Sequence, residues 1–426
     1  MKEPFEWDNY SDQPALLTDK KYKKKMRKLA FNSLLKTILL ALIILPLSIL
    51  AMPFVKRKEI DSNHFFSMGI DFERNPSETL TFINELGVQS VMLRFKLWEM
   101  DKLDELKQFI LQLEDKHITL KILQDREHIE DLTLLQTSLN HIFTTLNTSI
   151  NIYEIGSTTN RTKWGFFSVD EYNRFYQVAY DLQQTKFQNI KLIGSGVIAF
   201  EYHFTAHTLF NFFKFHYDGI ASLLYVDRRG APENAQMGFT LSDKIALLCT
   251  MAWLSPKTEN ELHITETNWP ISGTTPYAPT SEKECVSEEL YSDYMLRFHF
   301  LAFASQQVNS ISWHQLIAAG YGLVDNRGEL HKRKAFASYQ FMVKHLQNAQ
   351  FLRLDIKRDY YILQCLIDDQ LLQIHWSLKN TTLQNETSFD VYSSDGTSIK
   401  EKELRIGSSP LYIFIIQTVP KKVNCL

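Results

Sequence analysis

The residues best suited to chemistry lie in the run 261–270, which reads as a strand that ends in a carboxylate. The apolar Leu262 and Ile264 alternate with polar residues, which is the period-two pattern of a β-strand. Glu266 follows at the C-terminal end, and Pro270 prevents the strand from continuing. In a β/α barrel this end of the strands carries the chemistry. Glu266 is therefore predicted to be a nucleophile, and hydrolysis of a glycosidic bond is the reaction that such a carboxylate would serve.

Other polar and aromatic residues end the remaining predicted strands or begin the loops after them. Arg94 and Tyr225 are expected to hold Glu266 ionised, the first by its charge and the second by a hydrogen bond. The candidate substrate-binding residues are Arg94, Thr158, Asn160, Tyr225, Asp227, Glu233, Trp269, Trp313 and His314. Taken singly, each of these residue types more often serves packing or a surface ion pair. Their common position at one end of a barrel is what indicates a binding site.

The elements that must position these residues alternate between strands and helices. Eight strands are predicted, at 65–72, 90–95, 118–123, 150–157, 190–194, 219–226, 262–266 and 310–317. This order predicts an α/β fold, a (β/α)8 TIM barrel over residues 60–348. The alternative is an open doubly wound sheet, which would favour a glycine-rich turn after the first strand. The residues that follow Phe72 contain no such turn.

The two ends of the chain differ from the barrel. Residues 349–426 contain short strands and an Asp395-Gly396 turn, which predicts a small C-terminal β-sandwich-like module. Residues 1–28 form a polar tail that ends in a basic cluster, and residues 29–55 are apolar for long enough to form a transmembrane helix. The alternatives are a buried core helix and a cleaved signal peptide, but the basic region starts late and the apolar run is long.

The basic flank predicts a single-pass protein of the inner (cytoplasmic) membrane, with a cytoplasmic N-terminus and the barrel on the periplasmic or extracellular side. The net charge of −3 gives no electrostatic case for nucleic-acid binding. The four cysteines Cys249, Cys285, Cys365 and Cys425 lack metal-ligand spacing, so neither a metal nor another cofactor is predicted.

The barrel resembles the clan-A glycoside hydrolases. The resemblance is carried by the runs 265–270 (Thr-Glu-Thr-Asn-Trp-Pro), 311–314 (Ile-Ser-Trp-His), 321–325 (Tyr-Gly-Leu-Val-Asp) and 333–336 (Arg-Lys-Ala-Phe). It implies that Glu266 is the nucleophile, that Arg94 and Tyr225 support it, and that Trp313 stacks on a sugar. It also implies a carbohydrate partner, either a polysaccharide or a glycolipid.

One motif departs from the clan, which ends its fourth strand with an Ile-Gly-Asn-Glu-Pro-Asn type of run whose Glu is the general acid/base. Here Ser157 and Thr158 replace that Asn and Glu. A threonine hydroxyl cannot donate a proton near neutral pH. Glu154 has inward parity but lies roughly 13 Å lower on the strand, too low to replace the missing group. The candidate substitutes from loops are Asp125, Glu201, Asp227 and Glu233, and the polar loop 160–164 could hold an anionic sugar.

Three functions remain open at this point. The first is a membrane-anchored glycoside hydrolase that acts on an envelope or exported polysaccharide, with Glu266 as nucleophile and the proton donor displaced. The second is a catalytically inactive barrel that binds a glycan in a polysaccharide assembly system, as the lost Glu suggests. The third is a scaffold in such an assembly. The retained supports of Glu266 favour the hydrolase, because binding alone gives little reason to keep them.

Overall fold

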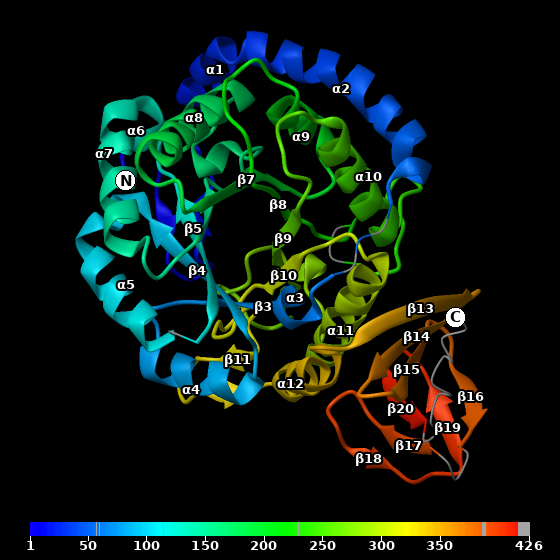
Figure 1. The fold of residues 1–426 in the computed structure, drawn as a ribbon. Helices are drawn as coiled ribbons and strands as arrows, with labels where there is room; N and C mark the ends of the chain where they lie inside the picture. Colours follow the sequence, from blue (N-terminus) through cyan, green and yellow to red (C-terminus); the bar gives the residue numbers. More distant parts are fainter. Residues whose placement is uncertain (57, 59, 114, 228–229, 386–388, 416–426) are drawn as a thin grey trace, which may run out of the picture.

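Most of the chain folds into one closed barrel. The computed structural model describes residues 1–426 except 57, 59, 114, 228–229, 386–388 and 416–426. Eight parallel strands pair in chain order, and the last pairs with the first (Figure 1). They are β3 (Phe66–Ile70), β4 (Ser90–Lys96), β5 (His117–Leu123), β6 (Ile152–Ile155), β7 (Lys191–Ile198), β8 (Gly219–Leu223), β9 (Leu262–Thr267) and β10 (Ser310–Trp313). The predicted TIM barrel is therefore confirmed.

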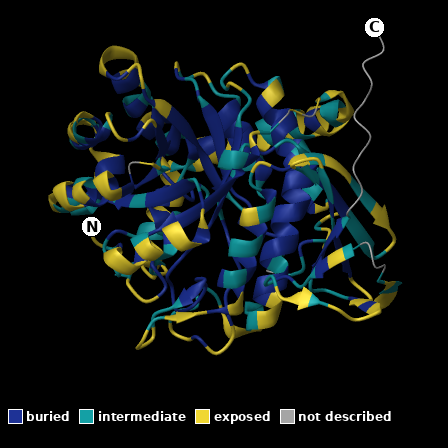
Figure 2. Cartoon of the chain, turned by 60° about the horizontal axis from the view of Figure 1, so that its bottom comes forward, coloured by how far each residue is buried: buried dark blue, intermediate teal, exposed yellow. Residues whose placement is uncertain are grey.

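The barrel strands are mostly buried because both of their faces are covered. In β4, for example, Val91, Leu93 and Phe95 are completely buried. Figure 2 shows the strands buried at the centre and the exposed residues on the outer sides of the helices. A charged residue that is buried as fully as Lys121 in β5, at 1% exposure, requires a charged or hydrogen-bonding partner.

Helices cover the outside of the barrel. They are α4 (Pro76–Leu86), α5 (Leu103–Ile110), α6 (Arg126–Glu130), α7 (Leu132–Leu146), α8 (Val169–Lys186), α9 (Tyr202–Leu209), α10 (Leu241–Leu254), α11 (Glu288–Ser305) and α12 (Lys334–Leu346), with the short α3 (Ser62–Phe65) before β3. The sequence places a helix at 207–213, whereas α9 begins at Tyr202 and ends at Leu209. The Asn211 side chain accepts a hydrogen bond from the Phe213 backbone N–H, which favours a turn there.

The C-terminal module is a six-stranded antiparallel sheet with a two-stranded ribbon beside it. The sheet order is β13 (Gln350–Lys357), β14 (Tyr360–Ile367), β15 (Gln370–Ser377), β20 (Leu411–Ile415), β17 (Phe389–Tyr392) and β18 (Ser398–Ile399). The ribbon is β16 (Thr381–Gln384) with β19 (Glu403–Ile406). The sheet packs beside α11 and α12 (Figure 1). Residues 416–426, including Cys425, lie outside the described residues.

The N-terminal helices α1 (Lys20–Leu29) and α2 (Phe31–Ala51) lie along the outside of the barrel, and α2 runs beside α9 and α10 (Figure 1). The inner side of α2 is polar: Thr37 Oγ1 lies 2.8 Å from His207 Nδ1. Its outer side exposes Phe31, Leu34, Leu35, Ile38, Leu39, Leu42, Ile43, Leu47, Ile49 and Leu50. Within the described part of the chain, 31–54 is the single helical stretch long and apolar enough to cross a membrane, a criterion that a signal sequence also meets.

Residues 1–19 fold onto the barrel and do not form a separate tail. β1 (Trp7–Asp8) and β2 (Gln13–Pro14) make a hairpin, and the Trp7 ring packs on Trp98 and Trp164 with centroids 5.2 and 5.9 Å apart. The sequence predicts that a membrane separates the N-terminal tail from the barrel. In the structure, the hairpin of this tail contacts the barrel directly. Two-residue strands carry no periodicity, so the sequence pattern did not reveal the hairpin.

Candidate functional site

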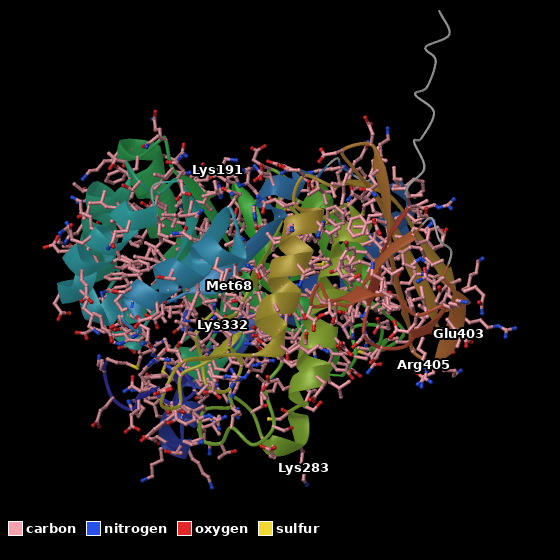
Figure 3. All side chains as sticks on the ribbon, turned by 90° about the horizontal axis from the view of Figure 1, so that it is seen from below. Met68, Lys191, Lys283, Lys332, Glu403 and Arg405 are labelled. Atoms are coloured by element: carbon pink, nitrogen blue, oxygen red, sulfur yellow. The ribbon has the colours of Figure 1, made fainter. Side chains whose placement is uncertain are left out.

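The carboxyl ends of the barrel strands surround a cavity of about 200 Å³, called the mouth pocket below. The barrel lines it with Arg94, Thr158, Lys163, Tyr225, Glu266 and His314, among others, and the hairpin contributes Asp12. Figure 3 shows the barrel from the side: Lys191, at the start of β7, and Lys283, in the loop after β9, lie at opposite ends. The dark blue N-terminal residues lie at the Lys283 end, which is the mouth.

Glu266 lies at the floor of the mouth pocket, at the end of β9. Its Oε1 accepts a 2.6 Å hydrogen bond from the Tyr225 hydroxyl, and its Oε2 lies 3.6 Å from Lys121 Nζ. Burial alone would raise the pKa of Glu266, but His314 in its protonated form, the charges of Lys121 and Arg94, and the Tyr225 hydrogen bond together outweigh burial and lower the pKa to about 2. Glu266 is therefore ionised near neutral pH, the form that a nucleophile needs.

Lys121 connects Glu266 to a second carboxylate below it. Its Nζ lies 3.3 Å from Glu154 Oε2, and Thr265 Oγ1 donates a 3.1 Å hydrogen bond to Glu154 Oε1. The two contacts of Lys121 place the Glu154 and Glu266 oxygens no more than about 7 Å apart, which is close enough for a catalytic carboxyl pair. Burial raises the pKa of Glu154 to about 7, although Lys121 opposes the shift. Glu154 is completely buried and does not line the mouth pocket.

Thr158 occupies the place where the resemblance implies a general acid. It lines the mouth pocket and has a left-handed backbone with φ of 52°. Its hydroxyl lies 3.2 Å from the Ser157 hydroxyl, and the Ser157 backbone N–H donates to Gln124 Oε1 at 2.9 Å. These contacts hold the end of β6 in a defined conformation, but they supply a hydroxyl and no acid.

Two of the four predicted substitutes do not line the pocket and have other partners. Asp125 begins α6 and accepts hydrogen bonds from the His128 backbone and from its Nδ1 at 2.9 and 2.8 Å. Glu201 pairs with Arg161 at 2.7 Å and accepts a 2.8 Å hydrogen bond from Asn160. Asn160 also donates to the Ile198 carbonyl, so it fixes the loop after β7 and does not face the pocket, contrary to its predicted role in substrate binding.

The other two substitutes also lie outside the pocket. Asp227 begins the loop after β8, where its carbonyl accepts from the Gly230 N–H at 2.6 Å. Glu233 is buried against the C-terminal module, 3.0 Å from Arg297 and 2.9 Å from Trp376 Nε1. The predicted substrate-binding roles of Asp227 and Glu233 are thus not supported, and Glu233 instead joins the barrel to the sheet. Arg228 and Arg229 of the same loop lie outside the described residues.

The predicted tryptophans belong to the core. Trp313 and Trp269 are almost completely buried and stack on each other with centroids 5.9 Å apart. Trp313 donates a 3.0 Å hydrogen bond to the Tyr291 hydroxyl and Trp269 donates to the Gly230 carbonyl, so neither offers a face to a sugar. The predicted stacking role of Trp313 is therefore wrong, and the binding role of Trp269 with it.

His314 presents the ring that Trp313 was expected to present. It lines the mouth pocket and stacks on Tyr321, with centroids 5.4 Å apart. Burial lowers the pKa of His314 to about 3, so the imidazole is neutral near neutral pH. A neutral imidazole beside a phenol ring gives the pocket a flat, weakly polar wall.

The structure thus brings five of the predicted residues to one pocket: Arg94, Thr158, Tyr225, Glu266 and His314. Arg94 acts on Glu266 through its charge, while its Nη2 pairs with Asp12 and lies 3.4 Å from Gln315 Oε1. Sequence reasoning missed Lys121 and Asp12. A lysine within the apolar run of β5 was a signal for the first, whereas no local pattern marks the second.

Comparison with known proteins shows the fold. No protein-family model matches the chain, and no curated protein matches it in sequence. Among solved structures, a family 39 glycoside hydrolase from the gut symbiont Bacteroides cellulosilyticus WH2 superposes with a TM-score of 0.64 and 12% identity, covering 84% of this chain and 82% of that one.

Two further structures agree. The GH39 enzyme of Xanthomonas axonopodis pv. citri gives a TM-score of 0.55 at 11% identity, over 84% of this chain and 94% of that one. A GH30 endoxylanase from Clostridium papyrosolvens C71 gives 0.53 at 9% identity, over 84% and 97%. The resemblance to clan-A glycoside hydrolases is confirmed for the fold, and the low identities agree with a divergent sequence.

Proposed function

We propose that the protein binds a carbohydrate in the mouth pocket and hydrolyses a glycosidic bond there, with Glu266 as the nucleophile. The observation that carries the proposal is the position of Glu266, an ionised carboxylate at the end of β9 that is held by Tyr225 and faces the pocket. The fold shared with glycoside hydrolases supports the same reading. An ionised carboxylate is the species that attacks the anomeric carbon in a retaining mechanism.

The neighbouring groups have distinct parts in this proposal. Tyr225 and Lys121 keep Glu266 ionised and aligned. The stacked rings of His314 and Tyr321 bind the apolar face of a sugar. Asn268 donates a 2.6 Å hydrogen bond to the His314 carbonyl and so positions that ring.

A second function, glycan binding without cleavage, is favoured by one specific observation. Among the described residues that line the pocket, the carboxylates are Glu266 and Asp12, and Asp12 is paired with arginines. A hydrolase needs a second carboxyl group about 5–10 Å from the first, in a position to reach the leaving oxygen. Glu154 meets the distance but is completely buried beneath the pocket.

Covalent trapping separates the two functions. A mechanism-based fluoro-sugar panel should label Glu266 in the unmodified protein, and Glu266→Gln should abolish both labelling and hydrolysis while it keeps glycan affinity. Glu261→Gln is the matched control, because Glu261 lies at the opposite end of the same strand, 3.4 Å from Lys191. If the protein binds a glycan but cleaves none, and no fluoro-sugar of the panel labels it, the second function, binding without cleavage, is the correct one.

We further propose that α2 attaches the protein to a membrane, near an envelope or exported polysaccharide. The exposed apolar side of α2 suits lipid, and the lysines of α1 suit anionic headgroups. Because α2 contacts α8, α9 and α10, we propose that it lies along the membrane surface and does not cross it. The hairpin and the barrel are then on the same side of the membrane.

A further inference from the structure

The N-terminal hairpin spans the opening of the mouth pocket. Lys163, from the loop after β6, donates a 2.5 Å hydrogen bond to Gln13 Oε1, and Gln13 Nε2 donates to the Pro279 carbonyl at 3.0 Å. The Tyr10 and Tyr277 rings meet edge to face with centroids 5.7 Å apart. The hairpin therefore contacts loops from two separate strands, and a ligand that reaches Glu266 must share the opening with it.

The turn of the hairpin presents one carboxylate to the pocket. Asp8 holds the turn by accepting hydrogen bonds from the Tyr10 N–H and the Ser11 hydroxyl at 3.0 and 2.5 Å. Asp12 has a left-handed backbone with φ of 54°, and its side chain is only 2% exposed. It pairs with Arg94 Nη2 and lies 3.4 Å from Arg74 Nη2. A buried carboxylate thus lies between two guanidinium groups that come from the barrel.

The charges that line the pocket favour an anion at this position. Apart from Asp12, its described charged lining residues are the cations Arg94, Arg161 and Lys163 and the carboxylate Glu266. With the hairpin docked, the Arg94 side chain is 11% exposed, and withdrawal of Asp12 would remove its carboxylate partner. Leaving such a charge unpaired is costly, and a neutral sugar cannot replace the lost charge. A ligand with its own acid group can.

We propose that Arg94 and Arg74 form a subsite for the acid group of an anionic glycan, that Asp12 occupies this subsite in the present structure, and that glycan binding and hairpin docking exclude each other. The ligand class is a sugar that carries a carboxylate, such as a uronic acid. This inference rests on the proposed function, because it assigns the glycan that the mouth pocket takes. It also explains why Arg94 contacts Asp12 and Gln315 and not Glu266 directly.

Matched sugars test the subsite. The probes are oligosaccharide pairs that differ only in a C6 carboxylate or a C6 hydroxymethyl group, built from glucuronic acid and glucose, mannuronic acid and mannose, and galacturonic acid and galactose. Affinities are measured by calorimetry for the full chain, for Asp12→Asn and for Glu6→Gln. Glu6 is an exposed carboxylate of the same segment, so Glu6→Gln makes the same change of net charge away from the pocket.

Asp12→Asn should bind at least one acidic probe about tenfold or more tightly than the unmodified protein does, and about tenfold more tightly than its neutral counterpart. Glu6→Gln should behave like the unmodified protein. Arg74→Gln, added to Asp12→Asn, should remove the preference for the acidic probe. If Asp12→Asn increased the affinity for the acidic and the neutral member of each pair equally, the subsite would be overturned, because the hairpin would then only block the pocket sterically.

Hydrogen exchange tests the exclusion directly. Saturating acidic probe should increase amide exchange at residues 7–14 of the unmodified protein, whereas the neutral probe should not; unchanged exchange with bound acidic probe would contradict the exclusion. The outcomes also separate the two proposals. Preferred binding of acidic glycans without any cleavage removes hydrolysis and keeps the subsite. Cleavage of neutral glycans without acid preference removes the subsite and keeps hydrolysis, and absence of all glycan binding removes both.

Discussion

The hydroxyl of Tyr225 donates a 2.6 Å hydrogen bond to Glu266 Oε1 across the adjacent ends of β8 and β9. The two residues are 41 positions apart in the chain, but parallel neighbouring strands bring their carboxyl ends to one place. A phenol that donates to a buried carboxylate stabilises its ionised form and fixes the direction of its second oxygen. A substitution of Tyr225 is therefore a direct test of the proposed role of Glu266.

Tyr225→Phe should weaken the nucleophile without removing it. A hydrogen bond to a charged group contributes about 1.5–3 kcal/mol, so labelling of Glu266 by a fluoro-sugar should slow by about 10- to 100-fold. The pKa of Glu266 should rise from about 2, which moves the acid limb of the pH–rate profile to higher pH. Tyr277→Phe, on the rim, is the control. An unmoved acid limb in Tyr225→Phe would show that Tyr225 does not act on Glu266.

Glu154 should make the protein less stable as the pH rises. The pKa of Glu154 is raised from 4.5 to about 7 in the folded protein by burial, so above pH 4.5 the folded state holds a proton that the unfolded chain has lost. This stabilisation, up to about 3 kcal/mol, is fully present below the unfolded pKa and is lost as the pH rises through about 7. Denaturant unfolding between about pH 5 and about pH 8 measures it. Glu154→Gln should remove most of this dependence of the unfolding free energy on pH. The same dependence in both proteins would contradict the prediction.

Glu233 should serve stability and not substrate binding. Glu233→Gln leaves Arg297, whose side chain is 2% exposed, without its ion-pair partner, which should cost about 3–5 kcal/mol of unfolding free energy. The double variant Glu233→Met with Arg297→Met should recover much of this loss, because no buried charge remains. Thermal unfolding and glycan affinity are measured together. Lost affinity with unchanged stability would restore the role in substrate binding that the sequence suggested.

The hairpin and the barrel should be labelled from the same side of a membrane. One cysteine at a time is introduced, by Glu6→Cys or by Lys283→Cys, in a background of Cys285→Ser and Cys425→Ser that keeps the buried Cys249 and Cys365. The two introduced cysteines should react equally with a membrane-impermeant maleimide in intact cells, or both only after lysis. The physical reason is that the hairpin contacts the mouth loops directly. Reaction of one site before lysis and of the other only afterwards would restore a membrane-spanning α2.

The barrel was predictable because its signals are local and repeated. Each strand is a short apolar run, each long helix has its own spacing, and Ser168 caps α8 by accepting from the Glu171 N–H, as its position suggests. β13, β16, β18 and β19 were not predicted. The last three span four residues or fewer, and several side chains of all four are exposed, so hydrophobic periodicity is weak there.

The site was predictable only where a residue lies on a strand or directly beside its end. Glu266 lies within β9, where strand parity still indicates the direction of the side chain. Trp313 and His314 lie at the end of β10, and both were candidates for substrate binding. The resemblance gave the stacking role to Trp313, but the ring that lines the pocket is that of His314. Asp12 reaches Arg94 across 82 residues, and a contact of this kind leaves no trace in local composition.

The hairpin is synthesised long before the loop on which it docks. Gln13 precedes Pro279, the rim residue that accepts its hydrogen bond, by 266 positions. At ribosomal speeds of roughly 5–20 residues per second, the first-made segment waits roughly 15 to 50 seconds before that part of the rim exists. Every nascent molecule therefore passes through a period in which its earliest residues are finished and their docking place is not.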